Sequence, residues 1–223
     1  MMTNTTPDQL PGMAQRVLQA QLEISATATG RGAFGVPFLA AAISAAFCQL
    51  DVLGRVPAAN GVAFTGFVTL WALVAGLMVA AYRARSKASR ATPGWRRAFT
   101  ALFAANGLIW GAAIFLLWAP GSDLNNFALL MLSILAMANA VNEHAESRRF
   151  IIAVALCNAA VTGAGFLLQH SGVGAAAAVL LPVAAIWFSF MAITANNRFR
   201  ELVATQIKNA ALAARYAASR DQA

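Results

Sequence analysis

Charged side chains are scarce in this chain. Only 11% of its 223 residues are Asp, Glu, Lys or Arg, whereas about 25% are charged in ordinary soluble domains. Hydrophobic residues make up 60% of the sequence. A soluble domain of this size could not bury so much apolar surface, so a soluble enzyme is excluded. With 16 Gly and 7 Pro, the chain also lacks the composition of a collagen or of a disordered segment.

Cysteines and catalytic patterns are equally sparse. Cys48 and Cys157 lie in apolar runs, which indicates buried thiols and neither a disulfide framework nor a zinc site. The sequence contains no Gly-rich phosphate loop, no Ser/His/Asp set and no cluster of carboxylates. We therefore expect no enzymatic activity, no metal and no cofactor, since no histidine pair is placed to hold a haem or a chlorophyll within a bilayer.

Long apolar runs, in contrast, are abundant. A bilayer core about 30 Å thick requires about 20 apolar residues of helix. Six runs without a charged residue approach this length, at residues 33–50, 61–82, 98–119, 127–142, 150–168 and 175–195. They are rich in Ala and Leu and do not alternate, which favours helices over the strands of a barrel. The predicted fold is all-α, a polytopic membrane protein with six transmembrane helices.

Basic residues fall almost entirely on one side of these spans. If the count is correct, fifteen of the sixteen Lys and Arg residues share one side and only Arg55 lies on the other. The positive-inside rule then predicts cytoplasmic termini, and we expect a multi-pass protein of the bacterial inner membrane. Anionic lipid headgroups account for the net charge of +8, so the lipid bilayer is the expected partner and nucleic acid is not.

Ionisable residues are missing from the middle of every predicted span. Transporters and channels keep such residues for their pathways, so their absence argues against a transporter. Glu143 and His144 at the inner end of the fourth span, and His170 at the outer end of the fifth, are interpreted as interfacial side chains in water or among headgroups. A proton relay or a metal site is the alternative.

Milder polar groups and small residues do lie within the spans. The candidate residues for helix packing or for a pocket are Asn106, Gly107, Trp110, Gly111, Asn139 and Asn158. Each asparagine needs a hydrogen-bond partner across a helix interface, and the two glycines have the small-xxx-small spacing that lets two backbones approach closely. We interpret this set as contacts between helices or, alternatively, as a site for a small ligand.

Both ends of the chain are predicted to continue as helices. Residues 8–24 are expected to form an amphipathic helix that lies on the cytoplasmic surface or packs on a neighbour. Its apolar stripe comprises Leu10, Met13, Val17, Ala20 and Ile24. The chain is thereby divided into a cytoplasmic arm (1–32), a transmembrane domain (33–195) and a cytoplasmic signalling-type helix (196–223).

The C-terminal helix has a heptad-like seam. It starts at Arg200 and includes Val203, Ile207, Ala210 and Ala214. Such a seam favours a parallel homodimer, whereas a solvated or interfacial end is the alternative. Pro182 in the sixth span is expected to kink the helix that leads into this seam, which makes it a candidate hinge or else a packing feature.

Short segments of the chain resemble a known class of membrane regions. They are Arg-Val-Leu-Gln-Ala-Gln-Leu (16–22), Gly-Trp-Arg-Arg-Ala-Phe (94–99), Asn-Gly-Leu-Ile-Trp-Gly (106–111), and Asn-Arg-Phe-Arg-Glu (197–201) opening an Ala-rich helix. Residues 17–223 resemble the six-span N-terminal region of bacterial sensor histidine kinases and diguanylate cyclases. The resemblance implies that the last helix leads into a dimerising output module. Because the chain has no phosphoacceptor His, ATP site or cyclase signature, we expect a sensor fragment or a stand-alone protein without kinase or cyclase activity.

The sequence therefore favours a membrane-embedded sensory or input module of bacterial signal transduction. A signal in the bilayer or at its outer face would pass through the sixth span to the C-terminal helix, which would pair with a second copy. One alternative is a structural accessory subunit of a larger integral-membrane complex, photosynthetic or respiratory. A small transporter is the third hypothesis.

Overall fold

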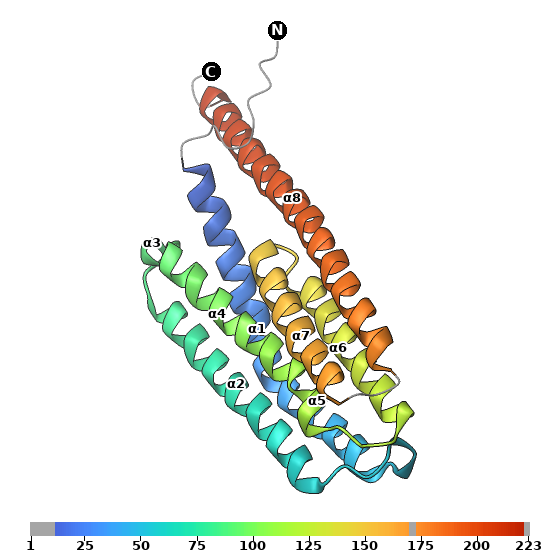
Figure 1. The fold of residues 1–223 in the computed structure, drawn as a ribbon. Helices are drawn as coiled ribbons and strands as arrows, with labels where there is room; N and C mark the ends of the chain where they lie inside the picture. The colour runs from blue at the N-terminus through green and yellow to red at the C-terminus, as the bar shows by residue number, and fades with distance from the viewer. Residues whose placement is uncertain (1–11, 170–172, 221–223) are drawn as a thin grey trace.

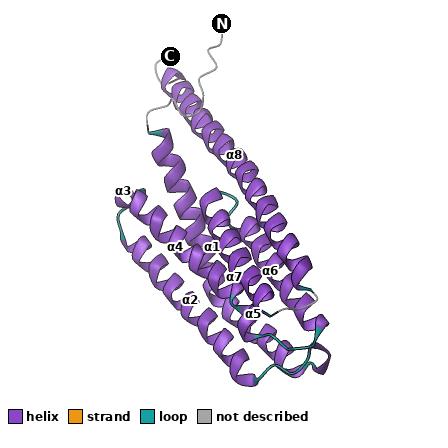
Figure 2. Ribbon diagram, in the orientation of Figure 1, coloured by secondary structure: helices purple, strands orange, loops and turns teal. Residues whose placement is uncertain are grey.

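The computed structural model describes residues 12–169 and 173–220, and every regular element within these ranges is helical (Figures 1 and 2). The elements are α1 (Met13–Gln49), the 3-10 helix η2 (Asp51–Leu53), α2 (Ala58–Ala84), α3 (Lys87–Arg90), α4 (Pro93–Gly111), α5 (Ala113–Leu116), α6 (Asp123–Glu143), α7 (Arg148–Leu168) and α8 (Gly174–Arg220). Six helices, counting α4 and α5 as one, are long and apolar enough to cross a membrane. The predicted all-α fold with six spans is confirmed, and the chain is a polytopic membrane protein.

The spans form an elongated bundle in which α1 begins and α8 ends on the same side (Figure 1). The connections from α2 to α4 and from α6 to α7 lie on that side as well. We call it the basic end, because the helix ends that adjoin these connections carry Arg83, Arg97 and Arg148. The other side of the bundle, where α1 leads into α2, is the opposite end.

Local capping explains where two of the spans begin. Thr92 precedes α4, and its side chain accepts a hydrogen bond from the Trp95 N–H at 3.5 Å. Ser122 precedes α6, and its hydroxyl accepts a bond from the Asn125 N–H at 3.2 Å. Because an N-cap satisfies a first-turn donor, α6 starts at Asp123 and is longer than the apolar run that predicted it.

Aromatic side chains fill the bundle near the basic end. The rings of Tyr82 and Trp95 meet edge to face with centroids 5.3 Å apart, and those of Phe103 and Phe150 lie 5.0 Å apart. The side chains of Tyr82, Phe103 and Phe150 are each only 1% exposed. This cluster joins α2, α4 and α7, and α1 packs against it.

The outer surface of the bundle is apolar. Phe34 and Phe38 on α1 are 81% and 78% exposed, and Ile186 on α8 is 71% exposed. Large hydrophobic side chains exposed in this number are unfavourable in contact with water, whereas contact with lipid is favourable. The exposure pattern therefore agrees with a bundle that faces hydrocarbon.

The N-terminal arm and the first span form one continuous helix. Helix α1 runs over 37 residues from Met13 to Gln49 with Pro37 in its interior, whereas residues 8–11 of the predicted amphipathic helix, Leu10 among them, lie outside the described residues. The N-terminal half of α1 packs on the aromatic cluster through Leu22 and Ala26, which are 0% and 1% exposed. Ile24, assigned to the apolar stripe, is 44% exposed instead. Contacts with several helices, more than a single stripe, orient this segment.

Both α1 and α8 are much longer than a membrane is thick. At 1.5 Å per residue, 37 and 47 residues extend about 55 Å and about 70 Å, against about 30 Å of hydrocarbon. Their excess lengths project beyond the bundle at the basic end (Figure 1). Val17 on α1 packs there with Val203 and Ala204 on α8. We call this paired projection, residues 13–28 and 196–220, the stalk.

Candidate functional site

A cavity of about 520 Å³ lies between α1, α2, α4 and α6, towards the basic end. Trp71, Phe103 and Trp110 contribute apolar walls, and Asn106 and His144 contribute polar ones. Small-molecule sites in proteins occupy about 300–1,000 Å³ and combine an apolar lining with a few polar groups. In size and lining, this cavity is the best candidate for a functional site.

The exposed members of the cavity wall show where it opens. Leu39 on α1 is 54% exposed and Leu135 on α6 is 60% exposed, and both line the cavity. Asn139, one turn along α6 from Leu135, is exposed as well. The opening thus lies between α1 and α6 at the lipid-facing surface, so a molecule dissolved in the bilayer could enter without passing through water.

The structure divides the six candidate residues into two groups. Asn106, Trp110 and Asn139 come together in the cavity wall, although they lie on two different helices. Trp110 is also held in place by the ring of Phe64, at a centroid distance of 5.6 Å. Of the other three candidates, Gly107 and Gly111 lie on the face of α4 that meets α7, and Asn158 lies on α7 itself.

Gly107 and Gly111 bring α4 against α7. A Cβ atom built on Gly107 would lie 2.5 Å from the Val154 carbonyl oxygen, and one built on Gly111 would lie 3.0 Å from the Asn158 carbonyl oxygen. Side chains larger than hydrogen would force the two backbones apart. The small-xxx-small spacing thus lies at a close helix contact, and these two glycines do not line the cavity.

Asn158 belongs to a polar contact between α6 and α7. Its side-chain oxygen accepts a hydrogen bond from the Ser133 hydroxyl, and Ser133 and Thr162 share a hydroxyl contact of 2.9 Å. All three side chains are buried. Hydrogen bonds of this kind stabilise helix pairs inside a membrane, and they keep Asn158 away from the cavity.

His144 is buried, contrary to its interpretation as an interfacial side chain. It is 4% exposed, and its ring lies 4.1 Å from that of Phe103. The Nε2 atom lies 3.9 Å from a carboxylate oxygen of Glu143, and Nδ1 lies 3.8 Å from one of Glu146. The α1 helix covers this loop, which sequence position at the end of a span does not reveal. His170 lies outside the described residues.

Glu146 is the centre of a buried polar junction that sequence reasoning missed. Its carboxylate accepts a hydrogen bond from the Ser25 hydroxyl of α1. Its backbone carbonyl accepts two more, from the Gln21 amide of α1 at 2.7 Å and from the Asn196 amide of α8 at 2.5 Å. We call these four residues together with His144 the polar junction. One short loop is thereby joined to both helices of the stalk.

The only sequence signal for this junction is weak. Glu146 is a second carboxylate two residues beyond His144, in a connection of four residues between α6 and α7. Among the residues that the structure describes, no group of three or more His, Cys, Asp or Glu side chains is arranged to hold a metal ion. The junction is therefore best described as a hydrogen-bonded contact between three chain segments.

The predicted seam of the C-terminal helix is partly occupied within the chain. Val203 is 8% exposed, and it packs with Val17 while Ile207 lies at the edge of the same cluster. Ala210 is exposed, and the side chain of Ala214 lies outside those that the structure describes. Pro182 lies on an exposed face of α8, which continues past it to Arg220. Its role as a hinge stays a prediction.

We expect the stalk to be crosslinked within one chain. In a background with Cys48 and Cys157 replaced by alanine, Val17→Cys with Val203→Cys should give several-fold more intrachain product with a short thiol crosslinker than Val17→Cys with Leu202→Cys, because Leu202 is 56% exposed on another face. Gel mobility distinguishes the products. A dominant product of twice the chain mass from Val203→Cys alone would show that this face pairs with a second copy instead.

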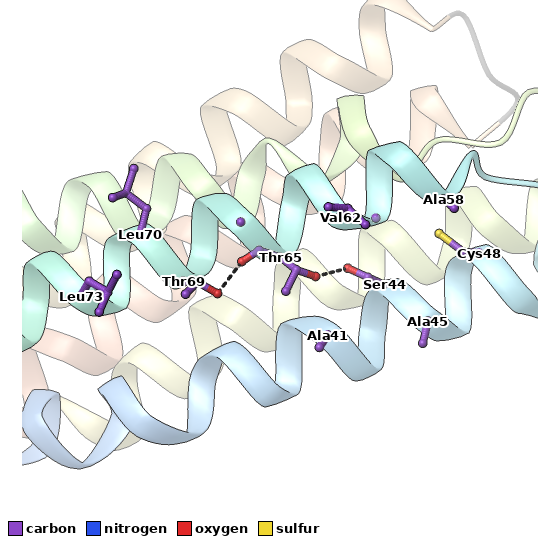
Figure 3. Close-up of a pocket in the computed structure, with 12 residues that line it drawn as sticks. Ala41, Ser44, Ala45, Cys48, Ala58, Val62, Thr65, Thr69, Leu70 and Leu73 are labelled. Atoms are coloured by element: carbon purple, nitrogen blue, oxygen red, sulfur yellow. Dashed lines mark hydrogen bonds between the residues drawn. The ribbon is translucent and has the colours of Figure 1, made fainter.

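A second hollow lies between α1 and α2 nearer the opposite end (Figure 3). This groove of about 630 Å³ is lined mainly by small and apolar side chains, among them Ala41, Cys48 and Leu70. Its three hydroxyl groups are satisfied within the protein: those of Ser44 and Thr65 bond to each other at 2.9 Å, and that of Thr69 donates to the Thr65 carbonyl at 2.8 Å. Such a groove can hold an acyl chain, but it has few polar groups with which to select a ligand.

Comparisons with protein-family models, with curated proteins and with solved structures found no match to this chain. Its function therefore has to be inferred from its own geometry.

Proposed function

We propose that the chain is a membrane-embedded sensory module in which occupancy of the cavity changes the position of the stalk. One observation carries this proposal: His144 forms part of the cavity wall, and two residues further along the same loop the Glu146 carbonyl is bonded to both α1 and α8. A molecule that displaces the His144 ring would move this loop, and the loop cannot move without disturbing both helices of the stalk.

The cavity indicates the chemical class of the ligand. Trp71, Trp110 and Phe103 offer apolar and aromatic walls, while the Asn106 and Asn139 amides offer hydrogen bonds. The opening between α1 and α6 faces lipid. We infer a small amphiphile with an apolar body and one hydrogen-bonding head, which partitions into the bilayer before it binds.

Transmission requires two arrangements of the stalk that the ligand stabilises to different extents. The apolar cluster that joins the two helices of the stalk is small, with Val17, Val203 and Ala204 as its buried members. A second arrangement therefore needs the loss of few contacts. The long α8 helix, which runs from the sixth span through Asn196 into the stalk, supports the predicted route to a downstream partner.

The proposed orientation places the basic end in the cytoplasm of a bacterial cell. The positive-inside rule supports it, because the α2–α4 and α6–α7 connections and the helix ends beside them hold seven of the fourteen arginines of the chain. An output module or a second copy would then meet the stalk in the cytoplasm, as the resemblance to sensor kinases and cyclases implies. The face of α8 that carries the exposed Ala210 is open for such a partner.

Filling the cavity tests the proposal. Ala136 lines the cavity on α6, so Ala136→Phe should weaken binding of a brominated long-chain alcohol at least about tenfold, equivalent to ~1.4 kcal/mol. Bromine quenches nearby indoles, and Trp71 and Trp110 both line the site, so saturable quenching of tryptophan fluorescence measures binding. The matched control is Ala160→Phe, at an exposed alanine on α7, and it should bind as the unmodified protein does.

The same alcohol tests the relay. Spin labels at the exposed positions Thr27 on α1 and Leu202 on α8 should change their separation when the alcohol binds, and should not do so in Ala136→Phe. Saturable binding with an unchanged separation would refute the relay while leaving the site intact. If the chain is instead recovered from native membranes in fixed proportion with a larger complex, and binds no alcohol, the accessory-subunit hypothesis replaces the sensory one.

A further inference from the structure

The outer face of α4 and α7 at the basic end has an unusual charge arrangement. Arg96 and Arg97 lie in the first two turns of α4, and Arg148 and Arg149 begin α7. The two helices run parallel, because Gly107 meets Val154 and Gly111, one turn further along α4, meets Asn158, one turn further along α7. Both N-termini, with their four arginines, therefore lie side by side.

This arrangement is unfavourable without an anion. The N-terminus of a helix carries a partial positive charge, so cations are destabilising there, and two parallel helices add their effects. Within residues 12–169 and 173–220, none of the four arginines forms an ion pair with a carboxylate. The Nε atom of Arg96 is buried and has no hydrogen-bond partner among the described residues. An anionic group that accepts hydrogen bonds would stabilise this place.

Below the arginines, a groove of about 670 Å³ runs between α4 and α7. Its sides are formed by Ala101 and Ala104 on α4 and by Ile152 and Ala153 on α7. The small side chains leave room along the helices, and the groove continues from the charged positions into the apolar part of the spans. The four arginines and the apolar groove below them together match a molecule with an anionic head and a hydrocarbon tail.

A smaller hollow of about 210 Å³ adjoins the groove and shares three of its arginines, Arg96, Arg148 and Arg149. Gln21 of α1 and Asn196 of α8, both members of the polar junction, line its other walls. Its lining is far more polar than that of the groove. The hollow suits a headgroup, and an occupant would lie against the donors that hold the Glu146 carbonyl.

We propose that the α4–α7 face binds an anionic glycerophospholipid, with its phosphate among the four arginines and an acyl chain in the groove. Basic pockets between transmembrane helices bind phosphorylated headgroups by this combination of charge and desolvation. The site is separate from the cavity between α1 and α6. Lipid composition would act on the stalk through the shared junction, independently of any ligand in the cavity.

Lipid titration of the delipidated full chain in neutral detergent, followed by native mass spectrometry, tests the site. Arg148→Gln with Arg149→Gln should weaken phosphatidylglycerol binding about thirtyfold, since each arginine near an anionic lipid contributes about a fivefold gain. The matched control is Arg83→Gln with Arg85→Gln, which removes the same charge from exposed positions at the same end and should change binding little. Phosphatidylcholine should bind all variants alike.

Two further arms separate a lipid from a soluble anion. Ala101→Phe fills the groove from an exposed position without changing charge, and it should also weaken phosphatidylglycerol binding. Glycerol 3-phosphate should not displace the lipid. If both arginine-pair variants lose lipid affinity equally, the effect is one of nonspecific charge. If glycerol 3-phosphate displaces the lipid and Ala101→Phe has no effect, the arginines bind a soluble phosphate. Either result overturns the proposal. If the Arg148/Arg149 variant does not fold, phosphatidylglycerol binding is measured with Ala101→Phe and Arg97→Gln instead. Both should weaken it, and unchanged binding in both overturns the proposal.

Discussion

Gly107→Ala should destabilise the bundle by about 1–3 kcal/mol, the cost expected when a well-packed contact is forced apart. The new Cβ atom would lie 2.5 Å from the Val154 carbonyl oxygen and 3.0 Å from the Val154 Cα atom. Both are backbone atoms, so no side-chain rotation relieves the overlap. Helix α4 has to move away from α7, which also loosens the buried contacts on either side of this point.

The measurement is the free energy of unfolding in mixed micelles, compared with a glycine on another helix. Gly76→Ala on α2 meets nothing within 4 Å, and alanine raises helix propensity at both positions by up to about 1 kcal/mol. The control should therefore be neutral or slightly stabilising, so that the difference between the two variants isolates the overlap. Equal stabilities would mean that α4 and α7 do not pack at Gly107.

The six spans could be predicted because hydrocarbon thickness and the absence of charge leave a signal within each short segment. The close approach at Gly107 and Gly111 also left such a signal, in the spacing of the two residues. The helix that these two glycines contact could not be predicted, because nothing in the sequence of α4 or α7 specifies that they pack on each other. The asparagines were interpreted as helix contacts or, alternatively, as pocket residues, and sequence could not say which applied to each. Asn158 lies in a helix contact, whereas Asn106 and Asn139 line the cavity.

The polar junction could not be predicted, because its members are far apart in sequence. Gln21 and Glu146 are 125 residues apart, and Asn196 and Glu146 are 50 apart. A histidine at the end of a span is normally interfacial. The burial of His144 results from α1, which extends over the loop, and from Phe103 of α4, against which its ring packs. The sequence predicted a separate helix over residues 8–24 and a span over 33–50, whereas α1 joins the two segments in one helix from Met13 to Gln49.

Ser25→Ala should lower the free energy of unfolding by about 2–3 kcal/mol, a large effect for the loss of one hydroxyl. Ser25 is 0% exposed and donates to the Glu146 carboxylate, which is 95% buried by side-chain exposure. A hydrogen bond to a charged group contributes about 1.5–3 kcal/mol, and leaving a buried charge without its donor costs its desolvation as well. The matched control is Thr27→Ala, since that exposed hydroxyl bonds only within its own helix, to the Glu23 carbonyl.

A double-mutant cycle separates this electrostatic effect from simple packing. In Ser25→Ala with Glu146→Leu no buried carboxylate remains to be satisfied, while the Gln21 and Asn196 bonds to the residue 146 carbonyl can persist because they involve the backbone. The double variant should therefore be more stable than Ser25→Ala alone, with a coupling of at least about 1.5 kcal/mol. Additive losses would show that the hydroxyl and the carboxylate act separately. Cavity occupancy could then reach the stalk only through the carbonyl bonds of Gln21 and Asn196, and replacing either amide should uncouple the two sites.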